Sequence, residues 1–297
     1  MWRYQDVTEE KGRATTAYAK LWPFGPDLLP RLLSAIVLIP LTAIALIAGW
    51  IPFALLIALV MAGAYREWEA MIIGRQSGWP AVFFMGMIAI AAVAHPMNGA
   101  WTSAIVFGVA IVLALFVKAP NRHWRIGGIV FFGFATVAFL AIRGSSAVGI
   151  WAGVFLVSVV WMTDIGAYFI GRIVGGTKLS PDVSPSKTWS GAAGGLCVGT
   201  LSGIAVWFVA GWVLDTPSPF AIGMLISVVV SISGQLGDLA ESAVKRRFAV
   251  KDSGDIIPGH GGLMDRIDSL TSAGIVLWGI GLANRGLGAV PQGILFW

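Results

Sequence analysis

Residues 148–170, VGIWAGVFLVSVVWMTDIGAYFI, form an apolar run that holds a single charged side chain, Asp164. A helix needs about 20 mostly apolar residues to cross the hydrocarbon core of a bilayer, so this run predicts a membrane-spanning helix. The whole chain has the same character, because hydrophobic residues make up 57% of its 297 residues and charged residues only 12%. A soluble domain has about 25% charged residues. The sequence therefore indicates a membrane protein with no large soluble domain.

Similar apolar runs lie on both sides of this one and predict further spans. The predicted spans are 32–49, 51–65, 81–94, 101–117, 126–142, 148–170, 190–213, 220–236 and 267–283. We therefore expect an all-α, polytopic integral membrane protein with about nine transmembrane helices. Residues 1–30 are expected to form a cytoplasmic tail, residues 31–145 the N-terminal transmembrane helices, and residues 146–297 a C-terminal transmembrane region that carries the catalytic groups.

The basic residues predict the orientation, because Lys and Arg concentrate in cytoplasmic loops. With the N-terminus inside, 18 of the 20 basic residues fall on the cytoplasmic side, and only Arg143 and Arg285 fall outside. These charges lie in short loops rather than in a patch interleaved with aromatic residues, so a nucleic-acid partner is not expected. Anionic lipid and phosphate suit them better. The expected location is the cell (inner) membrane, with the reactive side facing the cytoplasm.

A glycine recurs every four residues within the span at 190–213, at Gly191, Gly195, Gly199 and Gly203. Such a stripe lets another helix approach the backbone closely, either within the chain or in a homodimer. The single cysteine, Cys197, has no second cysteine with which to form an intramolecular disulfide or a thiolate metal site.

The segment 237–269, GDLAESAVKRRFAVKDSGDIIPGHGGLMDRIDS, holds six of the 15 carboxylates. A helix over 237–248 would place Asp238, Ser242 and Lys245 on one face. Asp265 and Asp268, three residues apart at the start of the last span, would likewise share a face. Carboxylates from two helices, without a cluster of Cys or His, suit a hard cation such as Mg²⁺.

The glycine-rich stretch at 258–262 lies between these acids. Its backbone N–H groups could converge on phosphate oxygens, and Lys245, Arg246, Arg247 and Lys251 add positive charge beside it. Metal-binding acids, phosphate-binding bases and a glycine loop together are what phosphoryl or nucleotidyl transfer requires. The alternative is an ordinary solvated loop, in which His260 would have no catalytic role. Two carboxylates at the edge of an apolar span, each costing about 2.5 to 3.5 kcal/mol, argue against that alternative for the whole set.

A second polar group lies at 163–191, between two predicted spans. Asp164 interrupts its apolar run, and the simplest alternative to a functional role is a packing carboxylate paired with Arg172 or Lys178. Ser184, Ser186 and Lys187 lie in a loop that also contains prolines. Hydroxyls, backbone donors and one ammonium group could bind a triphosphate there.

With these residues in view, the sequence resembles the phosphatidate cytidylyltransferase family, also called CDP-diacylglycerol synthase. The resemblance rests on residues 242–268, SAVKRRFAVKDSGDIIPGHGGLMDRID, and extends to Asp164-x-Gly166-Ala167-Tyr168, to Ser184-Pro185-x-Lys187-Thr188-Trp189 and to Arg66-Glu67-Trp68-Glu69. Ser190 departs from the pattern, which has an acidic or amide residue there.

The resemblance implies attack by the phosphate of phosphatidic acid on the α-phosphorus of CTP, with Mg²⁺ as cofactor and release of pyrophosphate, in phospholipid biosynthesis. It allows a monovalent cation such as K⁺ beside the Mg²⁺. The implied catalytic residues are Asp265, Asp238 and Lys245, and the implied metal ligands are Asp238, Asp265, Asp268 and Asp164. The expected substrate-binding residues are Ser184, Lys187, Ser242, Arg246, Lys251, His260, Gly261 and Gly262.

Two other functions fit parts of the pattern. A related CTP-dependent transferase could act on an isoprenoid lipid, because the motifs describe the nucleotide and metal more than the lipid tails. A membrane transporter would also place carboxylates in its spans. Its acids should, however, lie near the midplane of several helices, whereas most acids here gather at one membrane face.

Overall fold

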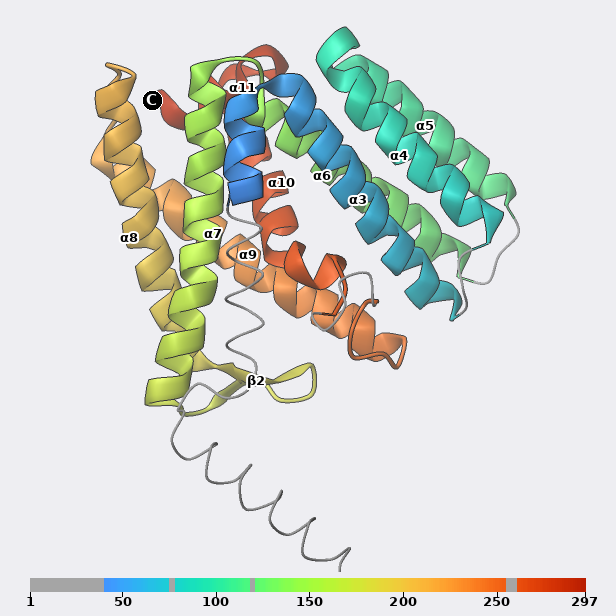
Figure 1. Ribbon diagram of the computed structural model, residues 1–297. Coiled ribbons are helices and arrows are strands. Elements are labelled where there is room, and N and C mark those ends of the chain that lie inside the picture. Colours follow the sequence, from blue (N-terminus) through green and yellow to red (C-terminus); the bar gives the residue numbers. More distant parts are fainter. Residues whose placement is uncertain (1–39, 75–77, 118–120, 255–260) are drawn as a thin grey trace, which may run out of the picture. The chain divides into compact units, whose positions relative to one another are not determined.

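The computed structural model describes residues 40–74, 78–117, 121–254 and 261–297 (Figure 1). The chain divides into two units, residues 1–44 and residues 45–297. Of the first unit only residues 40–44 are described, and they are helical. All features discussed below lie in the second unit.

The second unit is almost entirely helical. Its helices are α3 (Trp50–Ile73), α4 (Trp79–Asn98), α5 (Ala100–Phe116), α6 (Arg122–Arg143), α7 (Ala147–Val174), α8 (Trp189–Val213), α9 (Phe220–Arg247), α10 (Asp268–Arg285) and α11 (Val290–Leu295). Every apolar run predicted from residue 51 onward coincides with one of these helices. The first predicted run, 32–49, lies mostly outside the described residues, and its described part is helical up to residue 48.

Six of these helices are long and apolar enough to cross a membrane: α3, α4, α6, α7, α8 and α9. Helices α10 and α11 together would make a seventh span, although the chain bends by 109° between them. Helix α5 is apolar but shorter, at 17 residues. The chain is thus a multi-pass membrane protein, and the count of nine crossings stays a prediction.

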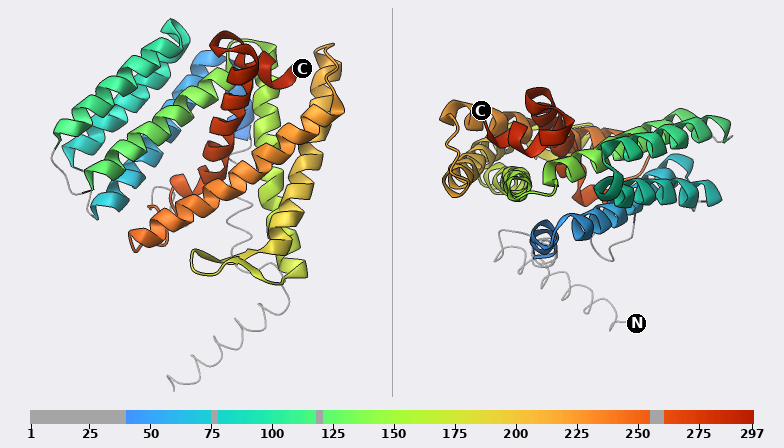
Figure 2. Two further views of the ribbon diagram at one scale, coloured as in Figure 1. Left: turned by 180° about the vertical axis from the view of Figure 1, so that it is seen from behind. Right: turned by 90° about the horizontal axis from the view of Figure 1, so that it is seen from above.

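The glycine stripe of α8 packs against α7, which runs beside it (Figures 1 and 2). A Cβ atom on Gly191 would lie 2.8 Å from the Ala167 carbonyl oxygen, and one on Gly195 would lie 2.6 Å from the Thr163 carbonyl oxygen. Such distances leave no room for a side chain. The stripe is therefore confirmed as a packing surface, and it serves the fold of the single chain.

A small β-hairpin joins α7 to α8 where the sequence predicted a loop. Strand β1 (Lys178–Ser180) pairs antiparallel with β2 (Ser184–Thr188). Pro185 is tolerated because both strands of a two-stranded sheet are edges. Thr188 then caps α8, since its hydroxyl accepts a hydrogen bond of 3.1 Å from the Gly191 N–H. The all-α prediction is correct for the rest of the described chain.

Two arginines are buried within helices rather than lying in loops. The prediction placed Arg125 in a cytoplasmic loop, but α6 begins at Arg122, and Arg125 pairs with Glu69 of α3 at 2% and 0% side-chain exposure. Arg143, one of the two exceptions to the charge rule, is 3% exposed. Its Nε donates to the Leu46 carbonyl oxygen at 2.6 Å. The exception therefore reflects a buried side chain and not a basic loop on the outer side.

Four helix ends meet where the polar residues gather. Helix α10 packs against α6, α7 and α9, and α3 packs against α6 (Figure 2). The Asn121 side chain, just before α6, donates to the carbonyl oxygen of Ile72 near the end of α3 at 2.8 Å. The Trp124 ring lies 5.3 Å from the Phe248 ring at the end of α9. The end of α3, the start of α6, the end of α9 and the start of α10 thus form one neighbourhood.

Candidate active site

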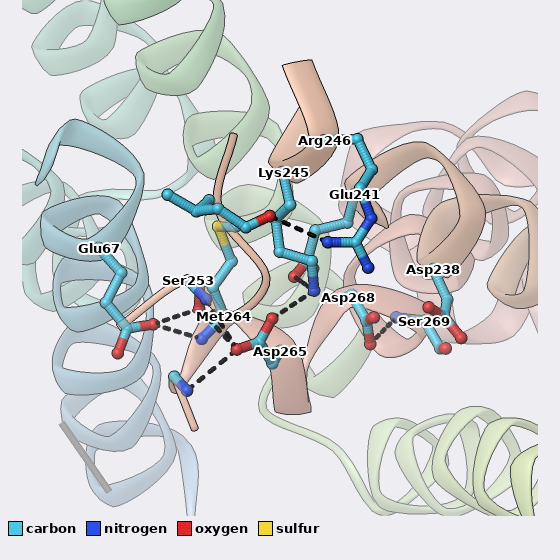
Figure 3. Close-up of polar contacts among 12 residues, drawn as sticks. Glu67, Asp238, Glu241, Lys245, Arg246, Ser253, Met264, Asp265, Asp268 and Ser269 are labelled. Atoms are coloured by element: carbon cyan, nitrogen blue, oxygen red, sulfur yellow. Dashed lines mark hydrogen bonds and ion pairs between the residues drawn. The ribbon is translucent and has the colours of Figure 1, made fainter. Parts of the chain in front are cut away.

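The last turns of α9 carry one acidic and basic face, as the sequence predicted. Asp238, Glu241 and Lys245 lie three and four residues apart on this helix. The Lys245 ammonium group donates to Glu241 Oε1 at 3.1 Å and forms a second ion pair with Asp265 (Figure 3). The side chains of Lys245 and Asp265 are 12% and 15% exposed. The sequence interpretation gave Glu241 no role, although it lies on the same face one turn before Lys245.

Asp265 lies in a short 3₁₀ turn, Met264–Arg266, just before α10. One carboxylate oxygen pairs with Lys245, and the other accepts the Ser253 N–H at 2.9 Å, the Ser253 hydroxyl at 3.0 Å and the Gly262 N–H at 3.0 Å. Burial raises the pKa of Asp265, but the hydrogen bonds from Lys245 and from the Ser253 backbone outweigh it and hold the pKa below its ordinary value. Asp265 is therefore ionised at neutral pH.

Asp268 is the first residue of α10, and Ile267 before it has non-helical dihedral angles (φ −122°, ψ 2°). The expectation that Asp265 and Asp268 share one helical face is therefore wrong. Asp268 accepts the N–H of Ser269 at 2.7 Å, and its charge interacts with those of Glu241, Asp238 and Asp164.

Asp238 is the centre of a second group of charges. Its carboxylate forms an ion pair of 2.6 Å with Lys187 of β2, and the two side chains are 31% and 25% exposed. Asp164 of α7 interacts electrostatically with both Asp238 and Lys187, and it forms a side-chain hydrogen bond with Ser269. In the described part of the chain Asp164 thus joins the charged group and not Arg172, whose Nη1 contacts the Tyr168 hydroxyl at 3.4 Å.

The site holds more acidic than basic side chains. Its carboxylates are Asp164, Asp238, Glu241, Asp265 and Asp268, and its ammonium groups are Lys187 and Lys245. Five carboxyl groups thus lie around two ammonium groups. Among the described residues no three Asp, Glu, His or Cys side chains lie close enough together to hold a metal ion by themselves. Mg²⁺ suits such an all-oxygen site nevertheless, since it binds through one or two carboxylates and completes its shell with water and substrate phosphates.

The glycine-rich stretch is only partly described, and Pro258, Gly259 and His260 lie outside the described residues. Gly261 has a φ of +78°, which favours glycine. The Gly262 N–H donates to Asp265, so it does not point to a phosphate as the sequence suggested. The Asp265 carboxylate therefore binds the backbone of the glycine-rich stretch at Gly262.

The other expected phosphate-binding residues surround this group. Arg246 is exposed, and its guanidinium donates to the carbonyl oxygens of Val183 at 3.3 Å and Val250 at 3.2 Å, which ties α9 to the hairpin. Lys251 is exposed, and Ser242 and Ser184 are half-buried. Their contacts with substrate stay predictions.

The sequence interpretation gave Glu67 of α3 no role in the site, but the structure places it there. It is 3% exposed and accepts the backbone N–H groups of Leu263 at 2.9 Å and Met264 at 2.8 Å, next to Asp265 (Figure 3). The predicted span ended at residue 65, so Glu67 seemed to follow it, whereas α3 continues to Ile73. A carboxylate two helical turns inside a longer span would have been the signal.

The chain is similar to known proteins over most of its length. The Cytidylyltransferase family matches residues 29–281. A phosphatidate cytidylyltransferase of Brucella suis biovar 1 (strain 1330) is 36% identical over 273 residues, which cover 91% of this chain and 98% of that protein. The phosphatidate cytidylyltransferase of Brucella melitensis biotype 1 matches to the same extent. That of Bacillus subtilis (strain 168) is 39% identical over 169 residues, or 55% of this chain and 61% of the relative.

Proposed function

Because this chain belongs to the cytidylyltransferase family, we propose that it transfers the cytidylyl group of CTP to phosphatidic acid. The products are CDP-diacylglycerol and pyrophosphate. A phosphate oxygen of phosphatidic acid forms the new bond to the α-phosphorus of CTP. The bond from that phosphorus to the oxygen shared with the β-phosphorus breaks, and pyrophosphate leaves with the electron pair.

The observation that carries this proposal is the pair of lysines held by carboxylates where α9, α10 and the hairpin meet. Phosphatidic acid is already ionised at neutral pH, so the attacking oxygen needs no general base. The protein must instead align two polyanions and offset their charge. Lys187 and Lys245 supply fixed positive charge in a partly buried place, where it acts more strongly than in water.

The carboxylates orient these two amines. Lys245 is bonded to Glu241 and to Asp265, and Lys187 is bonded to Asp238. We assign Lys187 and Lys245 to the phosphates of the substrates. Ser184, Ser242, Arg246, Lys251, His260 and Gly261 complete the proposed substrate contacts.

Asp238, Asp268 and Asp164 are the residues that would hold Mg²⁺, together with Asp265. Asp265 already accepts four hydrogen bonds, so the first three have more oxygen capacity for an ion. When bound, Mg²⁺ would offset the negative charge that develops on the leaving pyrophosphate. The excess of carboxyl groups over ammonium groups also leaves room for a monovalent cation such as K⁺.

The position of the site suits a lipid substrate. The acyl chains of phosphatidic acid can stay among the apolar helices while its headgroup reaches the helix ends. The basic residues at that end support a cytoplasmic orientation in the cell (inner) membrane, where CTP is available. A homodimer would need a surface other than the glycine stripe, because α7 covers the stripe.

In the direct test, detergent-purified protein is incubated with Mg²⁺, phosphatidic acid and CTP that is labelled at its α-phosphate. Labelled CDP-lipid and an equal amount of pyrophosphate are expected, and Asp238→Asn should lose both. Turnover only with a polyprenyl phosphate or an isoprenoid ether lipid would favour the related transferase. If CTP reacted with none of these lipids, the enzyme assignment would be overturned and a transporter would be the remaining hypothesis.

A further inference from the structure

Glu67 reaches the site from a distant part of the sequence. It lies on α3, 186 residues before Ser253 and 197 before Met264, and its side chain contacts both (Figure 3). Oε1 accepts the Leu263 N–H at 2.9 Å, and Oε2 accepts the Met264 N–H at 2.8 Å and the Ser253 hydroxyl at 3.0 Å. Met264 and Leu263 precede Asp265 in the sequence, and Ser253 is hydrogen-bonded to it.

Ser253 links Glu67 to Asp265. Its hydroxyl lies 3.0 Å from Glu67 Oε2 and 3.0 Å from Asp265 Oδ2, so these two oxygens share its one hydrogen, and its N–H donates to Asp265 at 2.9 Å. Asp265 in turn pairs with Lys245. The Ser253 network, defined as Glu67, Ser253 and Asp265, therefore connects α3 to the lysine assigned to the phosphates.

Two glycines make room for the Glu67 carboxylate. A Cβ atom on Gly254 would lie 2.8 Å from Glu67 Oε1, and one on Gly262 would lie 2.6 Å from Oε2 and 1.8 Å from the Ser253 hydroxyl oxygen. One turn before Glu67, a Cβ atom on Gly63 would lie 2.8 Å from Leu263 Cδ2. The backbone on both sides thus fits closely around this carboxylate.

The donors to Glu67 are unusual for a buried carboxylate in an apolar helix. Glu69, two residues later, is bound by the Arg125 guanidinium, as a buried charge requires. Within the described ranges no Lys or Arg forms an ion pair with Glu67. Its charge is instead satisfied by hydroxyl and backbone donors of the segment that holds Asp265, so its contacts fix that segment.

We infer that Glu67 is a positioning residue for the reaction: it holds Ser253 and the Leu263–Met264 backbone so that Asp265 keeps Lys245 in place. This inference rests on the proposed function. Glu67 would act through Asp265 without touching either substrate. Helix α3 then contributes to the reaction through Asp265 and is more than a scaffold for the site.

The test is Glu67→Gln in the full-length protein. The amide keeps the size of the side chain but turns one acceptor into a donor, so it cannot accept all three hydrogen bonds. We expect kcat to fall about 10- to 100-fold, as for other residues that orient a reactive group through a second residue. KM for CTP should change little, because no substrate contact is lost. The matched control is Tyr65→Phe on the same helix, which removes a contact with Glu69 and leaves the Ser253 network intact; its kcat should equal that of the wild type.

A second measurement reads the positioning without catalysis. Amide hydrogen exchange at Leu263 and Met264 should accelerate in Glu67→Gln, while the amides of α7 and α8 keep their protection. Wild-type kcat or unchanged exchange at both amides would overturn the inference. If the wild type made no CDP-lipid, the proposed function would fail, but the exchange data would still decide whether Glu67 holds the segment.

Ser253→Ala covers the case in which Glu67→Gln does not fold. It removes only the bridging hydroxyl and should also lower kcat at nearly constant KM. Where both variants fold, the double variant should lose less than the sum of the two effects, since both act through one network. A wild-type kcat in Ser253→Ala, or strictly additive losses, would contradict the inference.

Discussion

Two charged regions lie close together at the same helix ends, and they are built differently. Between α3 and α6, Glu69 and Arg125 form one pair that is 0% and 2% exposed. Around α9 and α10, Lys245 and Asp265 are 12% and 15% exposed, and Lys187 and Asp238 are 25% and 31% exposed. The first region has one carboxyl group for one guanidinium group, whereas the second has five carboxyl groups for two ammonium groups. We interpret the first region as a pair that stabilises the fold and the second as the proposed site for ions and polar substrate.

Asp265→Asn should have one of the two largest effects, together with Asp238→Asn. Asparagine loses the ion pair with Lys245 and cannot accept all the hydrogen bonds that Asp265 accepts from Ser253 and Gly262. Because it removes a charge that orients a phosphate-binding group, we expect kcat/KM to fall about a thousandfold. The measurement is transfer of label from CTP to phosphatidic acid. A loss below tenfold would mean that the Lys245 region is not where the reaction occurs.

Lys187→Met should have the next largest effect. The substitution removes the ammonium group that pairs with Asp238 but keeps most of the apolar stem. We expect kcat/KM for CTP to fall about a hundredfold, mainly through a higher KM if Lys187 binds the triphosphate. Initial rates across a series of CTP concentrations would show it. An unchanged KM for CTP would assign Lys187 to another role.

Arg125→Met tests the first region, the pair of Glu69 and Arg125. It leaves Glu69 as a buried charge without its partner, so the free energy of unfolding should fall by about 3–5 kcal/mol. Thermal unfolding in detergent would measure that loss. The kcat per folded molecule should stay at the wild-type value, and a specific loss of kcat at full stability would break the distinction between the two regions.

Tyr65→Phe should have the smallest effect. The Tyr65 hydroxyl donates to Glu69 Oε2 at 3.2 Å, and removing it should lower the free energy of unfolding by about 1 kcal/mol. The same unfolding assay applies. A loss as large as that of Arg125→Met would show that the first region depends on Tyr65 as much as on its ion pair.

The sequence predicted the helices well because the cost of burying polar groups in lipid leaves a strong record in hydropathy. The same cost indicated a role for Asp164, which interrupts an apolar run, and for Asp265, which borders one. Ser242 and Lys245 were placed on one face correctly because α9 continues without a break to Arg247.

Other features could not be read from local patterns. One predicted span ended at residue 65 and another began at residue 126, so Glu67 and Arg125 appeared to lie in loops. In the structure α3 continues to Ile73 and α6 begins at Arg122. The hydrogen bond between Glu67 and Ser253 joins residues 186 positions apart in the sequence, and local residue spacing does not predict such a contact. The hairpin has strands of three and five residues, too short for a clear alternating pattern.

The most direct test of this account compares kcat per folded molecule in Asp238→Asn and Arg125→Met, with phosphatidic acid and labelled CTP. The first variant changes the cluster around α9 and α10, and the second changes the pair of Glu69 and Arg125. The account predicts that labelled CDP-lipid is lost in Asp238→Asn and formed at the wild-type rate by the folded fraction of Arg125→Met. Equal losses in both variants, or a loss confined to Arg125→Met, would contradict it.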